Sequence, residues 1–455
     1  MLWLAIHFPA LSLEIFPSSS GPIAVAEKGI VSCNEKASIL GIRPGMTISA
    51  AHALSSGLIV KFRDRNAESE TLAGLAAWAG RFTPSVSIQA SGLLLEIGSC
   101  IRLHGGLTNL LSMARRDLHE MGYGFILSCA PAPHSAWLLA ISGNETFVME
   151  KEEIEKAIGK LPVELLSQPS KIVEGLEMIG AKRLEDCIKL PRSALARRFG
   201  KSLIDEIDRA LGKIPDPRKY FIPASIFERR LPLPASVMEA ESLLFALKRV
   251  LPELSGHLAL LQSGVQEIEL HCIHEDEKDT LLKAGFSAPT RSHEKMLLLF
   301  REILHGASLP SPVREIRIRA DKILPLASGN IDLFDDEDNE ESLLIERLRI
   351  RLGKDAVFGL SEIQDHRPEK AWQTCDSGCD AKGKPGRPFW LLKKPFRCRK
   401  GNLALLKGPE RIESGWWDGK DVSRDYYVAR DENGSRFWVF CDRSDGEWYV
   451  QGIFS

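Results

Sequence analysis

The chain has 455 residues, a formal net charge of −2, and a composition of 44% hydrophobic and 26% charged residues. A single hydrophobic core does not usually grow to this size, so the sequence predicts several domains. No apolar run approaches the ~20 residues that a transmembrane helix needs, so we expect no membrane segment. The charge excludes a chain that is basic throughout, as many nucleic-acid binders are, but it leaves room for basic faces on single elements.

The cysteines and the N-terminus indicate a cytoplasmic protein. Nine cysteines are scattered without paired spacing, which is typical of a reducing compartment. The first residues, MLWLAIHFPALSLEIF, are apolar but have neither a basic region nor a small-residue cleavage site. They predict buried strands at 2–6 and 11–16 rather than a secretory signal.

Residues 1–160 alternate short strands with helices. After the first strands we expect a strand at 23–29, two short helices with Thr47 or Ser49 as an N-cap, and a strand at 58–62. The pattern further predicts helices and strands in alternation, with helices at 66–82, 107–121 and 133–141 and strands at 85–97 and 124–129. This order predicts an α+β domain whose antiparallel sheet has helices on one face.

The rest of the chain divides into four parts by composition. Residues 161–222 are helical and charged, and GLEMIGAKRLEDCIKLP and LARRFGKSLIDEIDRALG within them are typical of helix-hairpin-helix units. Residues 223–325 alternate strand and helix patterns, which predicts a second, small α+β domain. Residues 326–342 form an acidic linker, and residues 343–455 begin with a helix that Gly353 ends and continue as a β-rich module.

The stretch ASGLLLEIGSCIRLHGG, from Ala90 to Gly106, carries a resemblance to a known family. With Leu95-Glu96-Ile97 in register, it resembles the active-site strand of the Y-family (translesion) DNA polymerases, whose pattern is roughly SxDEAYLDVT. EKASILGIRPGM and APAPHSAW resemble two further patterns of that family, YxxRxxGVxxGM and APxKxLAK. DAVFGLSEIQDHRPEKAW, RPFWLLKKP and GPERIESGWWDGKDVSRDYYVA resemble its inactive, ImuB-type branch.

The resemblance implies an α+β multidomain fold shaped like a polymerase right hand. By it, residues 1–160 are palm and fingers, 161–222 the helical thumb and 223–325 the little finger. Residues 326–342 are then the linker, and 343–455 are a small β-rich, partner-binding C-terminal region.

The residues that carry polymerase chemistry are replaced. Nucleotidyl transfer needs carboxylates that hold two metal ions. By the resemblance, the three carboxylate positions are held by Ala5, Ser91 and Gly92, none of which ligates a metal through a carboxylate. The resemblance therefore implies a chain with no catalytic residues, no metal and no cofactor.

The family's contacts to the nucleotide triphosphate are replaced as well. Glu35 and Ser38 take the places of the Tyr and Arg that touch the triphosphate, and Pro133 and Trp137 take the places of two lysines. The alternative is a divergent but active polymerase that uses remaining carboxylates, such as Glu14 or Glu96. We interpret Glu96 as a solvated charge at a strand edge.

The linker contains one apolar cluster, Asn330-Ile331-Asp332-Leu333-Phe334. It resembles the bacterial sliding-clamp peptide Gln-Leu-(Ser/Asp)-Leu-Phe, and it lies where the family carries its clamp motif. An extended peptide of this kind binds by placing a Leu-Phe pair in an apolar pocket. The alternative is an apolar pair that packs back on the protein itself.

Three pairs of basic residues are candidates for DNA contact. PVREIRIRADK predicts a strand with an apolar face and a basic face, because its Ile and Arg residues alternate. By the resemblance, such a face of the little finger lies along the DNA backbone, and the turns of the thumb do the same. The candidates are Arg317 and Arg319 in the little finger, and Lys182, Arg183, Arg197 and Arg198 in the thumb. The alternative for each pair is a solvated face.

The cysteines and aromatic residues of the C-terminal region carry weaker signals. Cys375 and Cys379 are spaced CxxxC without a second close pair, which does not predict a zinc site. The aromatic residues of this region, Trp416, Trp417, Tyr426 and Tyr427, predict the core of a small β module, with a partner surface as the alternative.

Taken together, the resemblance implies a scaffold for translesion DNA synthesis and induced mutagenesis. The implied partners are the sliding clamp (beta), an error-prone C-family polymerase, a RecA-like ImuA-type protein and primer-template or damaged DNA. The rivals are the divergent polymerase described above and a general DNA-binding module that does not use the clamp.

Overall fold

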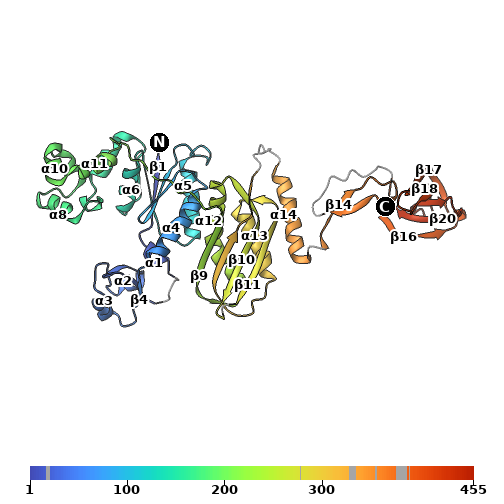
Figure 1. The fold of residues 1–455 in the computed structure, drawn as a ribbon, viewed down its shortest axis with the longest axis horizontal. Coiled ribbons are helices and arrows are strands. Elements are labelled where there is room, and N and C mark those ends of the chain that lie inside the picture. The colour runs from blue at the N-terminus through green and yellow to red at the C-terminus, as the bar shows by residue number, and fades with distance from the viewer. Residues whose placement is uncertain are drawn as a thin grey trace. The chain divides into compact units, whose positions relative to one another are not determined.

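The computed structural model describes residues 1–16, 21–276, 278–326, 335–353, 356–375, 387–388 and 390–454, without the side chains of 335–343 and 402. They form two compact units, Met1–Arg347 and Leu348–Ser455 (Figure 1). Among the described residues, no helix is both long and apolar enough to cross a membrane.

The palm is a five-stranded sheet in the order β5-β6-β1-β7-β8. Its strands are β1 (Trp3–His7), β5 (Val86–Gln89), β6 (Gly92–Glu96), β7 (Ile126–Ala130) and β8 (Thr146–Phe147). Strand β1 is central and pairs antiparallel with β6 and β7. The sequence predicted an antiparallel sheet, but the edge strand β8 runs parallel to β7.

Helices cover both faces of the palm sheet. Helices α4 (Arg65–Ala79) and α5 (Leu107–Glu120) pack on the face that holds Leu4, and α6 (Pro133–Ile141) packs on the face that holds Ala5. Figure 1 shows them on the two sides of β1. The prediction of helices on one face was wrong, because β1 and β6 are apolar at successive positions and bury both faces.

The predicted strand at 11–16 is also wrong. Residues Leu11–Glu14 form the single-turn helix α1, in which the N–H groups of Leu13 and Glu14 donate to the Ala10 carbonyl at 2.8 and 3.0 Å. The turn places Leu11 in the palm core, so the apolar residues are buried without a second strand.

The fingers are a small three-stranded sheet, ordered β3-β2-β4, with two short helices. Their elements are β2 (Ile23–Ala26), β3 (Ile30–Cys33), α2 (Glu35–Ile39), α3 (Ile48–Leu54) and β4 (Ile59–Phe62). Asn34 caps α2 by accepting from the Ala37 N–H at 2.9 Å, and Thr47 caps α3 by accepting from the Ala50 N–H at 3.2 Å. The predicted N-cap at Thr47 is confirmed.

The thumb is a chain of short helices that packs against α6. They are α8 (Ser170–Met178), α9 (Leu184–Lys189), α10 (Arg192–Phe199) and α11 (Lys201–Ala210). Helix α7 (Ile154–Gly159) lies just before the predicted start at residue 161 and packs with them. Gly180 turns the chain between α8 and α9 with φ +84°, and Gly200 turns it between α10 and α11 with φ +90°. Both turns need glycine because other residues rarely adopt this backbone conformation. Two successive helix pairs are thus formed where the sequence predicts them.

The little finger is a four-stranded antiparallel sheet in the order β11-β10-β12-β9, and β13 pairs with β10. Its elements are β9 (Phe227–Val237), α12 (Leu243–Leu260), β10 (Ser263–His274), β11 (Asp279–Thr290), α13 (His293–His305), β12 (Val313–Ala320) and β13 (Ile323–Pro325). The sequence pattern did not predict β11, an edge strand whose side chains are largely exposed.

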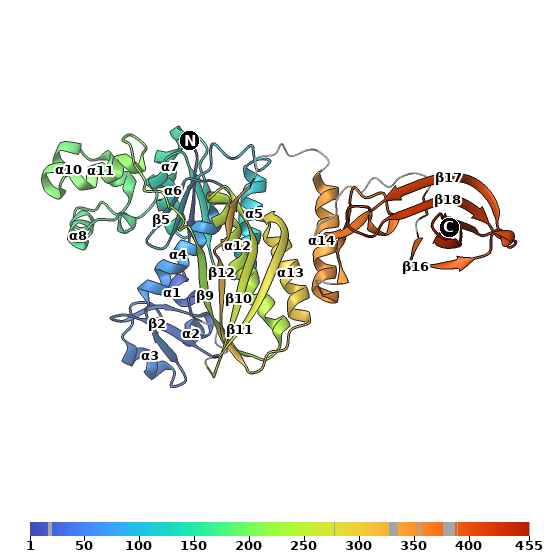
Figure 2. The same cartoon turned by 45° about the vertical axis from the view of Figure 1, so that its right-hand side comes forward.

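The little finger is joined to the palm by a close contact between α12 and α4. A β-carbon added at Gly256 of α12 would lie 2.0 Å from the Ala77 carbonyl oxygen of α4. Beside this contact, Arg229 of β9 lies 3.2 Å from the buried carboxylate of Glu253 on α12. This ion pair fixes α12 to the little-finger sheet next to the place where it meets α4. Figure 2 shows α12 next to α4.

The C-terminal unit begins in helix α14 (Asp335–Leu352), which Gly353 ends with φ +93°, as predicted. A two-stranded ribbon, β14 (Gly359–Glu362) with β15 (Trp372–Cys375), precedes a five-stranded sheet ordered β16-β20-β19-β18-β17. The strands of that sheet are β16 (Trp390–Cys398), β17 (Ala404–Ser414), β18 (Val422–Arg430), β19 (Arg436–Asp442) and β20 (Trp448–Ile453). Tyr426 stacks on Trp438 with ring centroids 4.3 Å apart, which confirms Tyr426 as a core residue.

Candidate functional site

The three positions that the sequence resemblance assigns to polymerase carboxylates lie together in the palm. Ala5 is at the centre of β1, opposite Leu94 of β6 and Ser128 of β7, and is fully buried. Ser91 and Gly92 lie at the start of β6, where Gly92 is paired with His7. The fold therefore assembles this site, although its residues come from segments more than eighty positions apart.

Trp137 of α6 closes the space above Gly92. A β-carbon at residue 92 would lie 2.1 Å from the Ile6 carbonyl oxygen and 2.9 Å from Cζ3 of Trp137. Only glycine fits there, because the first contact is with fixed backbone. The sequence assigned Trp137 to a lost lysine position but gave no sign that its ring fills the centre.

The ring of His7 lies in the same space, next to Trp137 and Ser91. Its ring lies edge-on to Trp137, with centroids 5.8 Å apart, and Nδ1 is 3.2 Å from both the carbonyl and the hydroxyl oxygen of Ser91. Burial lowers the pKa of His7, and the Ser91 carbonyl opposes that shift. A neutral imidazole, a tryptophan ring and a hydroxyl thus lie at the place that the sequence resemblance assigns to two carboxylates.

The remaining carboxylates near the palm are not paired with each other. Glu96 lies opposite Trp3, at the other end of β1 from His7, and accepts from the Gly98 N–H at 3.1 Å and the Ser99 hydroxyl at 2.9 Å. Glu14 accepts from the Gly124 N–H at 2.8 Å, and burial raises the pKa of this carboxyl. In the described part of the chain, no three His, Cys, Asp or Glu side chains are placed to hold a metal ion.

The fingers carry an arginine that the sequence analysis did not single out. Arg43 donates from Nη1 to the carbonyl and hydroxyl oxygens of Ser38, at 2.6 and 2.5 Å. The guanidinium is thus bonded within its own loop. Glu35 is exposed in the first turn of α2, so the position of the family's Tyr presents a negative charge to solvent.

The basic residues of the thumb lie at the turns between its helices. Lys182 and Arg183 precede α9, and their backbone N–H groups donate to the Asp186 carboxylate at 3.1 and 2.9 Å. Arg197 and Arg198 end α10. All four side chains are exposed, and none forms an ion pair within the described residues.

A buried carboxylate fixes the thumb to the palm helix α6. Glu206 of α11 accepts from the Ser167 N–H at 2.7 Å and the Gln168 amide at 2.5 Å, and it lies 3.3 Å from Nε2 of His134 on α6. Burial by itself raises the pKa of Glu206, but these hydrogen bonds outweigh it and the pKa is lowered. The carboxylate therefore stays charged and holds the two elements together.

Arg317 and Arg319 lie on the outer face of the little-finger sheet, and this face is not purely basic. Arg317 is 3.5 Å from Asp279 of β11, and Arg319 is 3.4 Å from Asp321. On the same face Lys283 lies 2.6 Å from Glu269. The prediction of a basic face considered only the arginines of one strand, whereas Asp279 on β11 and Asp321, which directly follows β12, lie beside them.

The clamp-like residues 330–334 lie outside the described residues. The structure describes the side chains of α14 from residue 344, and there the helix packs on the little finger. Glu346 accepts from the Ser287 N–H and hydroxyl at 2.5 and 2.7 Å, and Arg347 donates to Glu302 at 2.7 Å. These contacts join the helix that follows the motif to the little finger.

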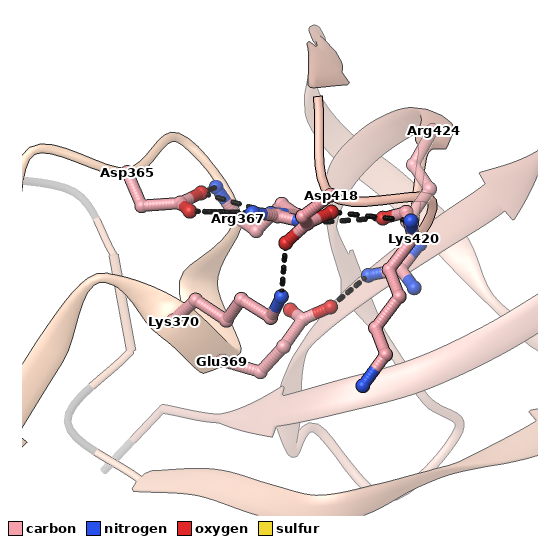
Figure 3. Close-up of polar contacts among 7 residues, drawn as sticks. All are labelled: Asp365, Arg367, Glu369, Lys370, Asp418, Lys420 and Arg424. Carbon is pink, nitrogen blue, oxygen red and sulfur yellow. Dashed lines mark hydrogen bonds and ion pairs between the residues drawn. The ribbon is translucent and has the colours of Figure 1, made fainter. Parts of the chain in front are cut away.

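The C-terminal unit contains a buried arginine that connects two segments far apart in the chain. Arg367 is 2% exposed and donates to Asp365, Asp418 and the Lys420 carbonyl, as Figure 3 shows. Arg367 and then Lys370 lower the pKa of Asp418. The network joins the DHRPEK segment to the GWWDGK loop, and Trp416 of this loop is 82% exposed.

Comparison with known proteins gives two kinds of match. Residues 18–140 match the impB/mucB/samB family. Protein ImuB from two strains of Caulobacter vibrioides, NA1000 / CB15N and ATCC 19089 / CIP 103742 / CB 15, is 26% identical over 91% of this chain and 100% of its own length. The chain is an ImuB-type homologue.

Solved structures of low similarity cover 72% of this chain and 100% of their own. A Dbh ternary complex has a TM-score of 0.40 and 18% sequence identity, and DinB from Sulfolobus solfataricus has a TM-score of 0.39 and 17% identity.

The closed palm leads to a prediction about Gly92. Replacing Gly92 by Ala should destabilise the palm by about 1–3 kcal/mol, because the new methyl group overlaps the Ile6 carbonyl. Native-state hydrogen exchange of the β1 and β6 amides measures the loss directly. Gly285→Ala is the matched control in another strand, since its nearest atom is 4.0 Å away. Equal protection in the two variants would contradict the steric argument.

Proposed function

We propose that the chain is a non-catalytic scaffold of a translesion DNA synthesis complex, which binds the sliding clamp and brings an error-prone polymerase to damaged DNA. The observation that carries the proposal is the filled palm centre. Trp137, His7 and Gly92 occupy the place where metal-binding carboxylates would lie. The family comparison supports the same role, because the chain is similar to ImuB along nearly its whole length.

The main rival is a divergent polymerase that uses Glu14 or Glu96. In-line displacement needs carboxylates close enough to hold two metal ions about 4 Å apart. The Glu96 carboxylate accepts a hydrogen bond from the Gly98 N–H in the turn that follows it, and the Glu14 carboxylate accepts one from the Gly124 N–H just before β7. Neither carboxylate has a second one beside it in the contacts described for the palm, which supports the non-catalytic role.

Primer extension separates the two functions. The full-length chain, free of other polymerases, should give no template-dependent extension with magnesium or manganese, and Glu96→Ala should not change this. An active Y-family polymerase on the same template is the control for the assay. Extension by the parent chain that Glu96→Ala abolishes would establish the rival.

The clamp proposal rests on the sequence 330–334 and on its surroundings. The nearest described elements are β13, which pairs with β10, and α14, which Glu346 and Arg347 attach to the little finger. A clamp-binding peptide enters an apolar pocket on its partner in extended form, and the described elements on either side of residues 330–334 are both attached to the little finger. The proposal therefore places the clamp beside the little finger.

Clamp binding should depend on the Leu-Phe pair. Leu333→Ala with Phe334→Ala should weaken binding at least ~30-fold, because loss of an interface anchor costs about 2 kcal/mol or more. Surface plasmon resonance on the immobilised bacterial clamp measures this. Leu324→Ala with Leu344→Ala, two exposed residues on either side of the motif, is the matched control. Unchanged binding by the first variant would show that the clamp motif is elsewhere or absent.

DNA contact through the basic turns of the thumb is part of the same proposal. Phosphate binding releases counterions in proportion to the number of phosphates neutralised, and free side chains achieve this better than paired ones. The thumb residues Arg197 and Arg198 form no ion pair within the described residues, whereas Arg317 and Arg319 each lie near an aspartate. The thumb should therefore contribute more to affinity than the little-finger face.

Salt dependence tests this order. Arg197→Gln with Arg198→Gln should lower the slope of log affinity against log salt by about 1.8 on duplex primer-template. Arg317→Gln with Arg319→Gln should lower it by clearly less. Fluorescence anisotropy between 50 and 200 mM salt measures both variants. A larger change for the little-finger variant would contradict the order proposed here.

The partner polymerase and the RecA-like partner are assigned to the C-terminal unit. Support comes from its exposed aromatic residues, since Trp416 is 82% and Trp417 57% exposed while Arg367 holds their loop in place. Exposed tryptophans are enriched at protein interfaces. The sequence prediction that Trp416 and Trp417 are core residues is wrong, because both side chains are exposed.

A further inference from the structure

Strand β16, the first strand of the C-terminal sheet, contains exposed aromatic rings and lies within a segment rich in positive charge. Between residues 387 and 407 the sequence has seven Lys or Arg residues and no Asp or Glu, although the whole chain has a net charge of −2. Trp390 and Phe396 of β16 are 69% and 52% exposed. The seven basic residues are Arg387, Lys393, Lys394, Arg397, Arg399, Lys400 and Lys407.

Most of these charges are free to meet a ligand. Only Arg387 and Arg397 form ion pairs with described residues, the first at 2.7 Å from Glu410 and the second with Glu447. The other five are exposed, and none of them has an ion pair within the described part of the chain. One of them, Lys400, lies 5.2 Å from the ring centroid of Trp448.

The strand register places the two rings on one face. Trp390 pairs with Ile453 and Phe396 pairs with Val450. These β20 residues pair in turn with residues 437 and 439 of β19, which are two positions apart and so point to the same side. The rings therefore share a face of the sheet.

Between the rings, β16 bulges. Leu391 pairs with Gly452 and Phe396 with Val450, so the four residues 392–395 stand opposite the single residue 451. The bulge contains Lys393 and Lys394, both exposed. The strand lies at the edge of the sheet order, with β20 on one side. Two exposed positive charges thus lie between the two exposed rings along the chain.

We propose that β16 and its bulge bind single-stranded nucleic acid. Lys393, Lys394 and Arg399 contact phosphates, and successive bases stack on Trp390 and Phe396. Base–aromatic stacking beside a basic track is the general means of binding single strands without sequence preference, and a duplex hides the base faces that such rings need. This goes beyond the function proposed above, which assigns duplex contact to the thumb, so the two can fail separately.

The test uses the full-length chain and a fluorescently labelled oligo-dT, with anisotropy as the readout. Trp390→Ala with Phe396→Ala should weaken binding at least tenfold, because each ring stacks one base. Lys393→Gln with Lys394→Gln should lower the salt slope by about 1.4, the value for two phosphate contacts to a single strand. Near-UV circular dichroism of the stacked Tyr426–Trp438 pair verifies that the sheet is folded in each variant.

Two matched controls belong to the same unit. Trp416→Ala with Trp417→Ala removes exposed rings outside the basic run, and Arg430→Gln with Arg436→Gln removes a cross-strand pair of exposed charges at another part of the sheet. Both should leave oligo-dT affinity within twofold of the parent. Arg197→Gln with Arg198→Gln should lower duplex affinity and spare oligo-dT binding, which separates this site from the thumb.

Three outcomes would overturn the proposal. The first is oligo-dT affinity that the Trp390/Phe396 variant leaves unchanged. The second is an equal loss in the Arg430/Arg436 control, which would show a diffuse electrostatic attraction. The third is a polyglutamate peptide of equal charge that binds as tightly as oligo-dT, which would assign the strand to an acidic protein partner.

Discussion

The contact between Trp137 and Gly92 determines what the palm can do. It needs a residue without a β-carbon on β6, because the Ile6 carbonyl and the Trp137 ring leave no room for one. It also needs a small residue at the centre of β1, and Ala5 is fully buried there. The palm sheet is therefore packed through its centre like an ordinary core, where a polymerase keeps a polar, metal-binding pocket.

A packed palm is a firm base for the other domains. Helix α4 covers one face of the sheet and is itself in backbone contact with α12 of the little finger, through Gly256 and Ala77. On the other face, α6 carries His134, which meets the buried Glu206 of the thumb. Palm, thumb and little finger are thus joined by close contacts. Such a base suits the scaffold role proposed above.

The sequence predicted the order and type of most elements because their patterns are local. The helix at 133–141, the cap at Thr47 and the glycine end of α14 depend on a few neighbouring residues. The errors concern features that depend on distant residues. Helices on both palm faces follow from the whole sheet, and β11 is an exposed edge strand without a clear apolar alternation.

The candidate site shows the same division between local and distant information. The loss of carboxylates at Ala5, Ser91 and Gly92 is visible in the sequence, but the ring that fills the space comes from α6 and is known only from the fold. Likewise, Arg317 and Arg319 alternate with isoleucines in the sequence, while the approach of Asp279 on β11 to Arg317 is found only once the strands are paired. A basic pattern in one strand shows that positive charge is present, but it does not show whether that charge is free to bind a phosphate. Free charge is what phosphate binding requires, and among the described residues both the thumb turns and β16 offer it. Single-stranded and duplex nucleic acid would then contact different units of the chain.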